Sequence, residues 1–177
     1  CKKRDIALTG GECAFHDNLN GLEISITASA FIKNLQPNLF PRNDLLIGIQ
    51  SNGLHASGFS LVRRVYRDED RVEFTAPTFN YLPAILALQE EFEIHGRLHL
   101  AGGSYARLRD FAQENNILIG RQHHLQPQQI FHELREKGIS DEDLYTTFNC
   151  GIGFILAVSS YHASSIINRL ATLDFKA

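Results

Sequence analysis

The sequence predicts an α/β fold in which a mixed β-sheet is flanked by helices. Short apolar runs typical of buried strands occur at residues 45–49, 94–101 and 151–158. Each run is followed by a segment in which apolar residues recur every three or four positions, as in an amphipathic helix. Glycine-rich turns follow the first two of these runs. This alternation favours layers of sheet and helix, although it does not establish that all strands are parallel.

The first 43 residues are expected to hold two strands and a domain junction. Residues 6–9 form a short apolar run that stops at two glycines, and residues 23–32 alternate between apolar and other side chains, as in a half-buried strand. Pro37 and Pro41 lie close together within residues 34–43 and exclude regular structure there. We therefore expect the boundary between two domains in this segment.

The remaining elements are assigned from apolar spacing and from residues that start or end helices. Pro83 fits only the first turn of a helix, Gly138 ends one, and Ser140 with Asp143 resembles a capping box. In order, the sequence predicts a strand over 45–49, a helix from 61 that fades by 70, a helix over 78–92, a strand over 94–101, a helix from 108 to 115, a strand over 117–119, helices over 128–137 and 141–147, a strand over 151–158 and a helix over 161–173.

Composition and charge restrict the class of protein. With 177 residues, 44% of them hydrophobic, the chain can bury one sizeable core or a core and part of another. A net charge of −3 gives no electrostatic footprint for nucleic acid, and no apolar run is long enough to span a bilayer. Three scattered cysteines favour a reducing, cytoplasmic setting. Since no methionine occurs, even at position 1, we expect the chain to be part of a longer protein.

The glycine-rich turn at residues 51–58 is the strongest candidate for a binding site. It joins a strand to a helix, and Gly53 and Gly58 allow backbone N–H groups to approach an anion. A Walker A loop is rejected, because Phe59 and Ser60 stand where that loop needs Lys followed by Ser or Thr. His55 and Ser57 supply side-chain hydrogen-bonding groups instead. An ordinary strand-to-helix connection with a solvated histidine fits the local pattern equally well.

Three other glycine turns can contribute to the same site. They are residues 10–12, residues 102–104 and residues 148–153. If the strand ends converge on one edge of the sheet, these turns form the kind of crevice in which α/β proteins bind ligands. Such a site consists largely of main-chain donors, which suit a phosphate or a phosphorylated sugar.

Histidine and cysteine chemistry receives little support. His95 and His99 lie on the same face of a predicted strand but about 13 Å apart, too far to share a metal ion. Cys150 stands in an apolar strand context, where a free thiol is usually an inert small hydrophobe. We expect neither a structural zinc site nor covalent catalysis.

Four segments together resemble the phosphoribosylformylglycinamidine cyclo-ligase (aminoimidazole ribonucleotide synthetase) family. Residues 51–63, Ser-Asn-Gly-Leu-His-Ala-Ser-Gly-Phe-Ser-Leu-Val-Arg, resemble its Ser-Ser-Gly-x-His-Ser-Asn-Gly-Tyr-Ser-Leu-Val-Arg. Residues 95–103 are similar to its His-Gly-x-x-His-Ile-Thr-Gly-Gly, residues 144–153 to its Met-Tyr-x-Thr-Phe-Asn-x-Gly-x-Gly, and residues 10–14 to its Gly-Gly-Glu-Thr-Ala. Order and approximate spacing agree over nearly the whole chain.

The resemblance implies a cytoplasmic enzyme of purine biosynthesis. ATP would activate the formyl oxygen of formylglycinamidine ribonucleotide, and ring closure would release ADP and phosphate. The resemblance also implies Mg²⁺ and a homodimer, both provided largely by an N-terminal ATP-binding domain. Residues 1–36 would be the last strands of that domain, and residues 37–177 most of a C-terminal aminoimidazole ribonucleotide synthetase-like domain. We expect this chain alone to be inactive.

Site residues follow from the matched positions. His55 and Glu12 are candidate catalytic groups, and Glu12 is also a candidate for binding the substrate amine or a metal. The candidate substrate- and phosphate-binding residues are Ser51, Gly53, Ser57, Gly58, Gly102, Gly103, Ser104, Arg107 and Asn149.

The chain also departs from the family pattern. Ala56-Ser57 replaces Ser-Asn, and residues 104–109 replace a third glycine and a downstream Glu-Asn-x-Pro-Arg. Arg107 either binds phosphate in place of the lost groups or is a solvated helix residue. One alternative function is therefore a non-catalytic paralogue that binds a nucleotide or a partner. Another is a related enzyme of the selenophosphate synthetase, hydrogenase-maturation or thiamine-phosphate kinase type.

Overall fold

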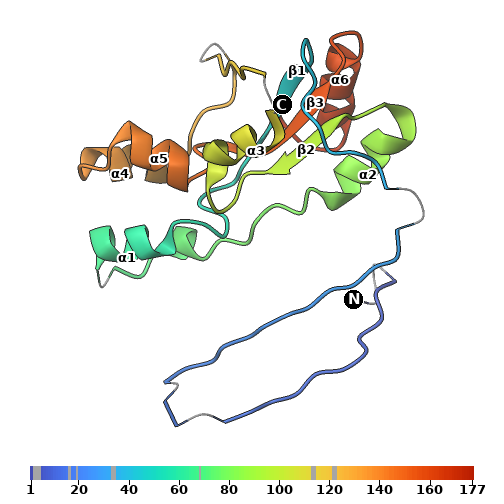
Figure 1. The fold of residues 1–177 in the computed structure, drawn as a ribbon. Helices are drawn as coiled ribbons and strands as arrows, with labels where there is room; N and C mark the ends of the chain where they lie inside the picture. The colour runs from blue at the N-terminus through green and yellow to red at the C-terminus, as the bar shows by residue number, and fades with distance from the viewer. Residues whose placement is uncertain are drawn as a thin grey trace. The chain divides into compact units, whose positions relative to one another are not determined.

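A computed structural model describes residues 1, 5–15, 17–18, 20–32, 35–67, 69–112, 115–120 and 123–177. The chain divides into two compact units, Cys1–Leu35 and Gln36–Ala177. The second unit contains all of the assigned helices and strands (Figure 1).

The first unit shows no helix or strand in its described residues, so the strands predicted at residues 6–9 and 23–32 are wrong for this structure. Leu8, Ile24 and Ile26 of these segments are exposed. Alternation of apolar residues makes one face of a strand suitable for burial, but a strand also needs a hydrogen-bonded neighbour. The described residues of this unit form no such pairing.

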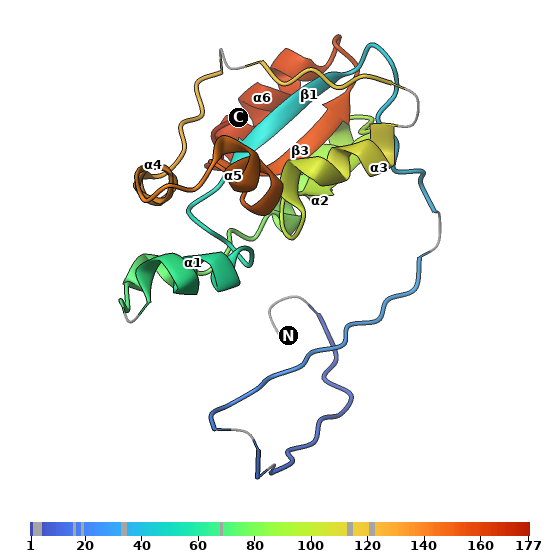
Figure 2. The ribbon, with the colours of Figure 1, turned by 60° about the vertical axis from the view of Figure 1, so that its left-hand side comes forward.

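The second unit is built on a three-stranded sheet. The strands are β1 (Leu45–Gln50), β2 (Gly96–His99) and β3 (Ile152–Val158), in the order β1-β3-β2. β3 lies in the centre beside β1 (Figure 2) and is almost entirely buried, as its continuous apolar sequence predicts. Both pairings are antiparallel, so the described sheet is not mixed, although the predicted combination of sheet and helices is confirmed.

The helices agree closely with the sequence predictions. They are α1 (Phe59–Tyr66), η2 (Val72–Phe74), α2 (Leu82–Glu91), η3 (Ser104–Arg107), α3 (Leu108–Ala112), α4 (Gln129–Glu136), α5 (Asp141–Thr147) and α6 (Ala163–Thr172). Among these, no helix is long and apolar enough to cross a membrane.

The clearest differences concern the start of α2, the end of α3 and residues 117–119. α2 begins at Leu82 rather than at residue 78, because Pro83 is accepted only within the first turn. The helix expected to reach residue 115 is described as far as Ala112, and residues 113–114 lie outside the described part. Residues 117–119 are not a strand, and Leu118 is 91% exposed, because this short run has no strand beside it in the described sheet.

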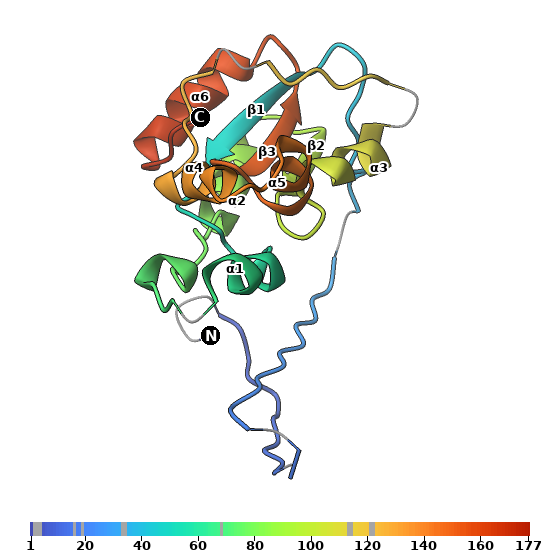
Figure 3. The same cartoon turned by 90° about the vertical axis from the view of Figure 1, so that its left-hand side faces the viewer.

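Helices cover both faces of the sheet. On one face, α2 and α6 pack through Leu88 and Ile166 against Leu156 of β3. On the other face, Leu108 of α3 packs with Ile155 of β3. Figure 3 shows α6 and α3 on opposite sides of the strands.

A further apolar cluster joins α1, η2, α4 and α5. Its centre is Phe148, which is completely buried and packs against Phe131 at a ring-centroid distance of 5.9 Å. The links between this helical layer and the sheet are the loop after β1 and the loop before β3. The candidate site lies on these links.

Candidate functional site

Three loops meet at one end of the sheet. They are residues 51–58 after β1, residues 100–104 after β2 and residues 148–151 before β3. Since β1 and β2 both run antiparallel to β3, the ends of β1 and β2 lie beside the start of β3. Hydrogen bonds from Ser51 N to Gly151 O, 2.8 Å, and from Leu100 N to Gly153 O, 2.9 Å, extend both pairings into the loops. The antiparallel topology therefore brings three of the four predicted turns together.

Asn149 holds the first and third loops together. Its side-chain amide is buried, and Nδ2 donates a hydrogen bond of 2.7 Å to Gly53 O. Its Oδ1 accepts from Ser51 Oγ at 2.7 Å and from Gly151 N at 3.0 Å. These bonds occupy the amide with protein groups, so Asn149 supports the loops.

Ser57 and Ser104 connect the loops to the end of α5. Ser57 Oγ donates to Thr147 O at 2.6 Å, and Ser104 Oγ donates to Phe148 O at 2.5 Å. Both serines are buried. Their hydroxyl protons satisfy carbonyl groups that have lost helical partners at the C-terminus of α5.

The backbone in these loops is unusual. His55, Ser104 and Cys150 have positive φ angles of 56°, 37° and 45°, a region that costs energy for residues with a side chain. Such conformations are frequent at ligand-binding sites, where the surrounding structure enforces them. Gly58, with φ 78°, lies directly against Phe148, so a Cβ there would be 2.5 Å from Cζ of that ring.

Three rings form the centre of the site. The ring centroids of His55, Tyr81 and His99 lie 5.8–6.0 Å from one another. Gly153 makes room for them, because a Cβ at this position would overlap the Tyr81 hydroxyl and lie 2.6 Å from His55 Cε1. His55 is only 4% exposed.

Burial lowers the pKa of both imidazoles, which favours their neutral forms. It lowers the pKa of His55 to about 4, and the neighbouring His99 adds to the effect. The pKa of His99 is also lowered, mainly by burial and further by the positive charge of Arg107. Within the described residues, His55 Nδ1 and His99 Nε2 are buried without a hydrogen-bond partner. A polar ligand or ordered water is the usual partner for such atoms.

Arg107 adds a positive charge beside the rings. It ends η3, and its side chain lies over the preceding turn, with Cγ 3.1 Å from where a Cβ of Gly103 would be. Gly102 is exposed, and nothing lies within 4 Å of where its Cβ would be. The open turn and the exposed guanidinium can together receive an anion.

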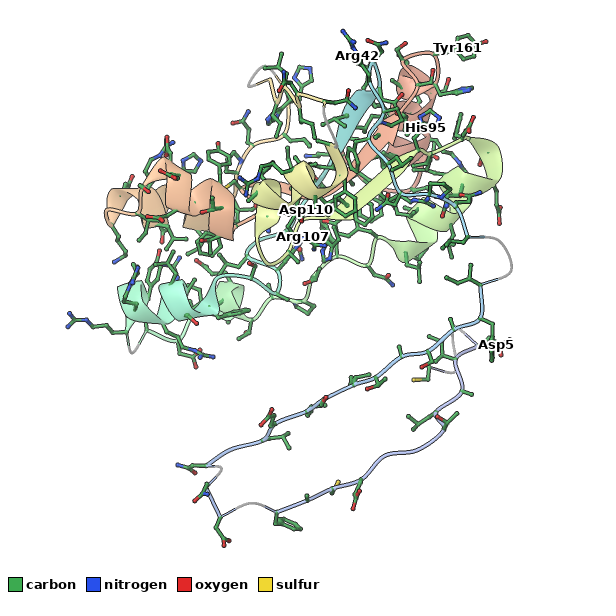
Figure 4. All side chains as sticks on the ribbon, in the orientation of Figure 1. Asp5, Arg42, His95, Arg107, Asp110 and Tyr161 are labelled. Carbon is green, nitrogen blue, oxygen red and sulfur yellow. The ribbon has the colours of Figure 1, made fainter. Side chains whose placement is uncertain are left out.

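Three other residues discussed from the sequence are Glu12, His95 and Cys150. Glu12 belongs to the first unit, where it is exposed, so its role stays a prediction. His95 and Arg107 lie at opposite ends of β2 (Figure 4). At the start of β2, His95 Nδ1 is 2.6 Å from Asp44 Oδ2, and His95 lines a cavity of about 570 Å³. Cys150 is buried and its pKa is raised to about 12 by burial, as expected of an inert thiol.

Tyr81 and Gln128 were not predicted to lie at the site. Tyr81 Oη donates to Gln50 O at 2.7 Å, and Gln128 Nε2 donates to Ser51 O at 2.6 Å. His99 was a rejected metal ligand with His95 and a matched position within residues 95–103, without a predicted role in the site. Its place in a sequence segment containing two glycines was the available signal, but its neighbours come from distant segments.

Comparison with known proteins identifies the family. A sequence model of the family described as "AIR synthase related protein, C-terminal domain" matches residues 42–172. The chain belongs to this family. The AIR synthase-related match covers all of the sheet and the three site loops.

Curated relatives of this AIR synthase-related chain are named phosphoribosylformylglycinamidine cyclo-ligase. The protein of Clostridium perfringens strain 13 is 31% identical over 100% of this chain and 58% of its own length. The protein of Saccharolobus solfataricus is 32% identical, covering 96% of this chain and 53% of its own length. That of Clostridium tetani is 32% identical over 100% and 58%. The chain thus spans somewhat more than half the length of these relatives.

Proposed function

We propose that the full-length protein to which this chain belongs closes the imidazole ring of aminoimidazole ribonucleotide in purine biosynthesis, using ATP. The observation that carries the proposal is the meeting of three loops around the neutral imidazoles of His55 and His99, beside Arg107. The names of the curated relatives support the same reaction.

The geometry favours positioning and charge stabilisation. Activation of the formyl oxygen by phosphoryl transfer from ATP needs an oriented substrate and positive charge more than a nucleophilic side chain. In our proposal, Arg107 and the backbone N–H groups of Gly102 and Gly103 hold a phosphate. His55 forms a hydrogen bond to the reacting part of the ribonucleotide.

Neither Mg²⁺ binding nor the role of Glu12 is assigned to these three loops. The described residues contain no group of three or more His, Cys, Asp or Glu side chains that could hold a metal ion. We therefore assign no Mg²⁺ ligand and no step through Mg²⁺ to these loops. Glu12 remains a proposed contact to the substrate amine or a metal, and a cytoplasmic homodimer is part of the same proposal.

The test is ADP release by the full-length protein. Release that depends on formylglycinamidine ribonucleotide supports the proposal, and ATP turnover that ignores this substrate contradicts it. Replacing Arg107 with Gln should raise the KM for formylglycinamidine ribonucleotide about tenfold, because a charge-assisted hydrogen bond to phosphate is lost. Arg109→Gln is the matched control, since Arg109 is exposed on the neighbouring helix α3.

A second candidate is binding without turnover. The side chains of Ser51, Ser57, Ser104 and Asn149 all form hydrogen bonds within the protein, which leaves few polar side chains for a substrate. Nucleotide binding measured by calorimetry, without ADP release under any substrate condition, would favour this function.

A further inference from the structure

Asn52 lies between a backbone carbonyl and the imidazole of His55. Its Nδ2 donates a hydrogen bond of 2.8 Å to Pro77 O, and its Oδ1 is 2.8 Å from His55 Nε2. The backbone carbonyl of Pro77 therefore fixes the orientation of the Asn52 side-chain amide.

The orientation of the amide determines the tautomer of His55. A carbonyl oxygen can only accept, so the NH₂ group of Asn52 must face Pro77 and the amide oxygen must face His55. That oxygen also can only accept, which requires Nε2 of His55 to carry the proton. The contact of 3.4 Å from Asn52 N to the same Nε2 would need the opposite tautomer, but it is beyond the usual hydrogen-bond distance.

The other nitrogen of His55 is consequently a hydrogen-bond acceptor. In a neutral imidazole with the proton on Nε2, Nδ1 carries the lone pair. Nδ1 is buried and has no partner within the described residues. The hydroxyl of the neighbouring Tyr81 donates its proton to Gln50 O, so it does not supply a donor to Nδ1.

The surroundings keep this acceptor in its neutral form. The titratable and charged groups near the ring are Tyr81 before α2 and His99 on β2, with Arg107 of η3 beyond His99. Burial and His99 both lower the pKa of His55. No carboxylate is among the groups that shift it.

We propose that Asn52 is a positioning residue that holds His55 in the Nε2–H tautomer, so that His55 Nδ1 accepts a hydrogen bond from an N–H group of the ligand. The class of ligand rests on the proposed function: the amine or amidine nitrogens of a ribonucleotide. The family pattern that residues 51–63 resemble has Ser where Asn52 stands.

The tautomer can be measured without any ligand. In the full chain labelled with ¹⁵N-histidine, NMR near neutral pH should show His55 Nε2 protonated and Nδ1 unprotonated. Asn52→Asp should keep this tautomer, because the carboxylate still accepts, and should raise the pKa of His55. Asn52→Leu should give a mixture of tautomers.

Asn38→Leu is the matched control for loss of a bridging amide. The side chain of Asn38 donates a hydrogen bond of 3.0 Å to Arg97 O and accepts one of 2.7 Å from Arg97 N. Arg97 lies on β2, and neither bond involves His55. Asn38→Leu should leave the tautomer unchanged. A wild-type His55 protonated on Nδ1, or an Asn52→Leu variant with an unchanged tautomer, overturns the positioning role.

Ligand binding tests the second half of the proposal. Formylglycinamidine ribonucleotide should shift the Nδ1 resonance of His55, whereas ribose 5-phosphate, which has no N–H group, should not. Asn52→Leu should weaken the binding of formylglycinamidine ribonucleotide about tenfold and leave the binding of ribose 5-phosphate unchanged. Equal shifts with both compounds overturn the acceptor role. Absence of ADP release with the tautomer intact counts against the proposed reaction alone.

Discussion

Replacing Gly58 with Ala should destabilise the protein through two separable effects. Gly58 has φ 78°, and an added Cβ would lie 2.5 Å from Cζ and 2.8 Å from Cδ1 of Phe148. Phe148 is completely buried at the centre of the helical layer, so its ring cannot move without disturbing Phe131 and the end of α5.

The magnitude follows from adding the two effects. The left-handed backbone costs a residue with a Cβ about 1–2 kcal/mol. Forcing a methyl group into a well-packed core costs about 1–3 kcal/mol more. The sum, about 2–5 kcal/mol, is a large part of the total stability of an ordinary domain.

Gly138→Ala separates the two effects. Gly138 also has a positive φ, 93°, but nothing lies within 4 Å of where its Cβ would be. This variant should therefore lose only the backbone part, about 1–2 kcal/mol. Urea unfolding followed by circular dichroism gives both free energies of unfolding. Equal losses in the two variants would refute the argument that Phe148 fills the space beside Gly58.

Three further predictions concern the site and the helices. Gly153→Ala should lower substrate-dependent ADP release by the full-length protein about 100-fold, because the methyl group displaces His55; Gly48→Ala, on β1, should have a much smaller effect in the same assay. His55 is protonated near pH 6.5 in the unfolded chain but only near pH 4 in the folded chain. The stability that the neutral ring contributes is therefore complete above pH 6.5 and is lost as the pH falls toward 4. Urea unfolding across this range should show that the free energy of unfolding falls by about 3 kcal/mol, and by less in His55→Asn. Ser140→Ala should cost about 1 kcal/mol in thermal or urea unfolding, because Ser140 Oγ accepts a hydrogen bond from Asp143 N at the start of α5.

Local chemistry made much of the fold predictable. Pro83 restricted the start of α2, and Ser140 with Asp143 marked the start of α5, because these residues act on backbone groups within one turn. The buried strand β3 was visible as an unbroken apolar run. Residues 23–32 carried an equally clear alternation, but a strand also requires a paired neighbour, which the segment itself cannot supply.

The candidate site was predictable only in part. Glycine turns after β1 and β2 identified two loops, because positive φ angles and close approach favour glycine. The matched family positions gave Asn149 a role in ligand binding, and in the structure its amide forms hydrogen bonds with Ser51 and Gly53. A side chain's partners depend on which segments meet, and the sequence does not state them.

By itself, the sequence determined the order of most helices and strands, the glycine turns and the resemblance to one family, because these depend on residues close together in the chain. The tertiary structure decided that β1 and β2 both run antiparallel to β3, which places their ends beside its start. It also decided that His55, Tyr81 and His99 share one buried cluster and that Asn52 faces His55. Burial and hydrogen-bond partners arise only when distant segments pack together, and they set which histidine nitrogen is free to meet a ligand.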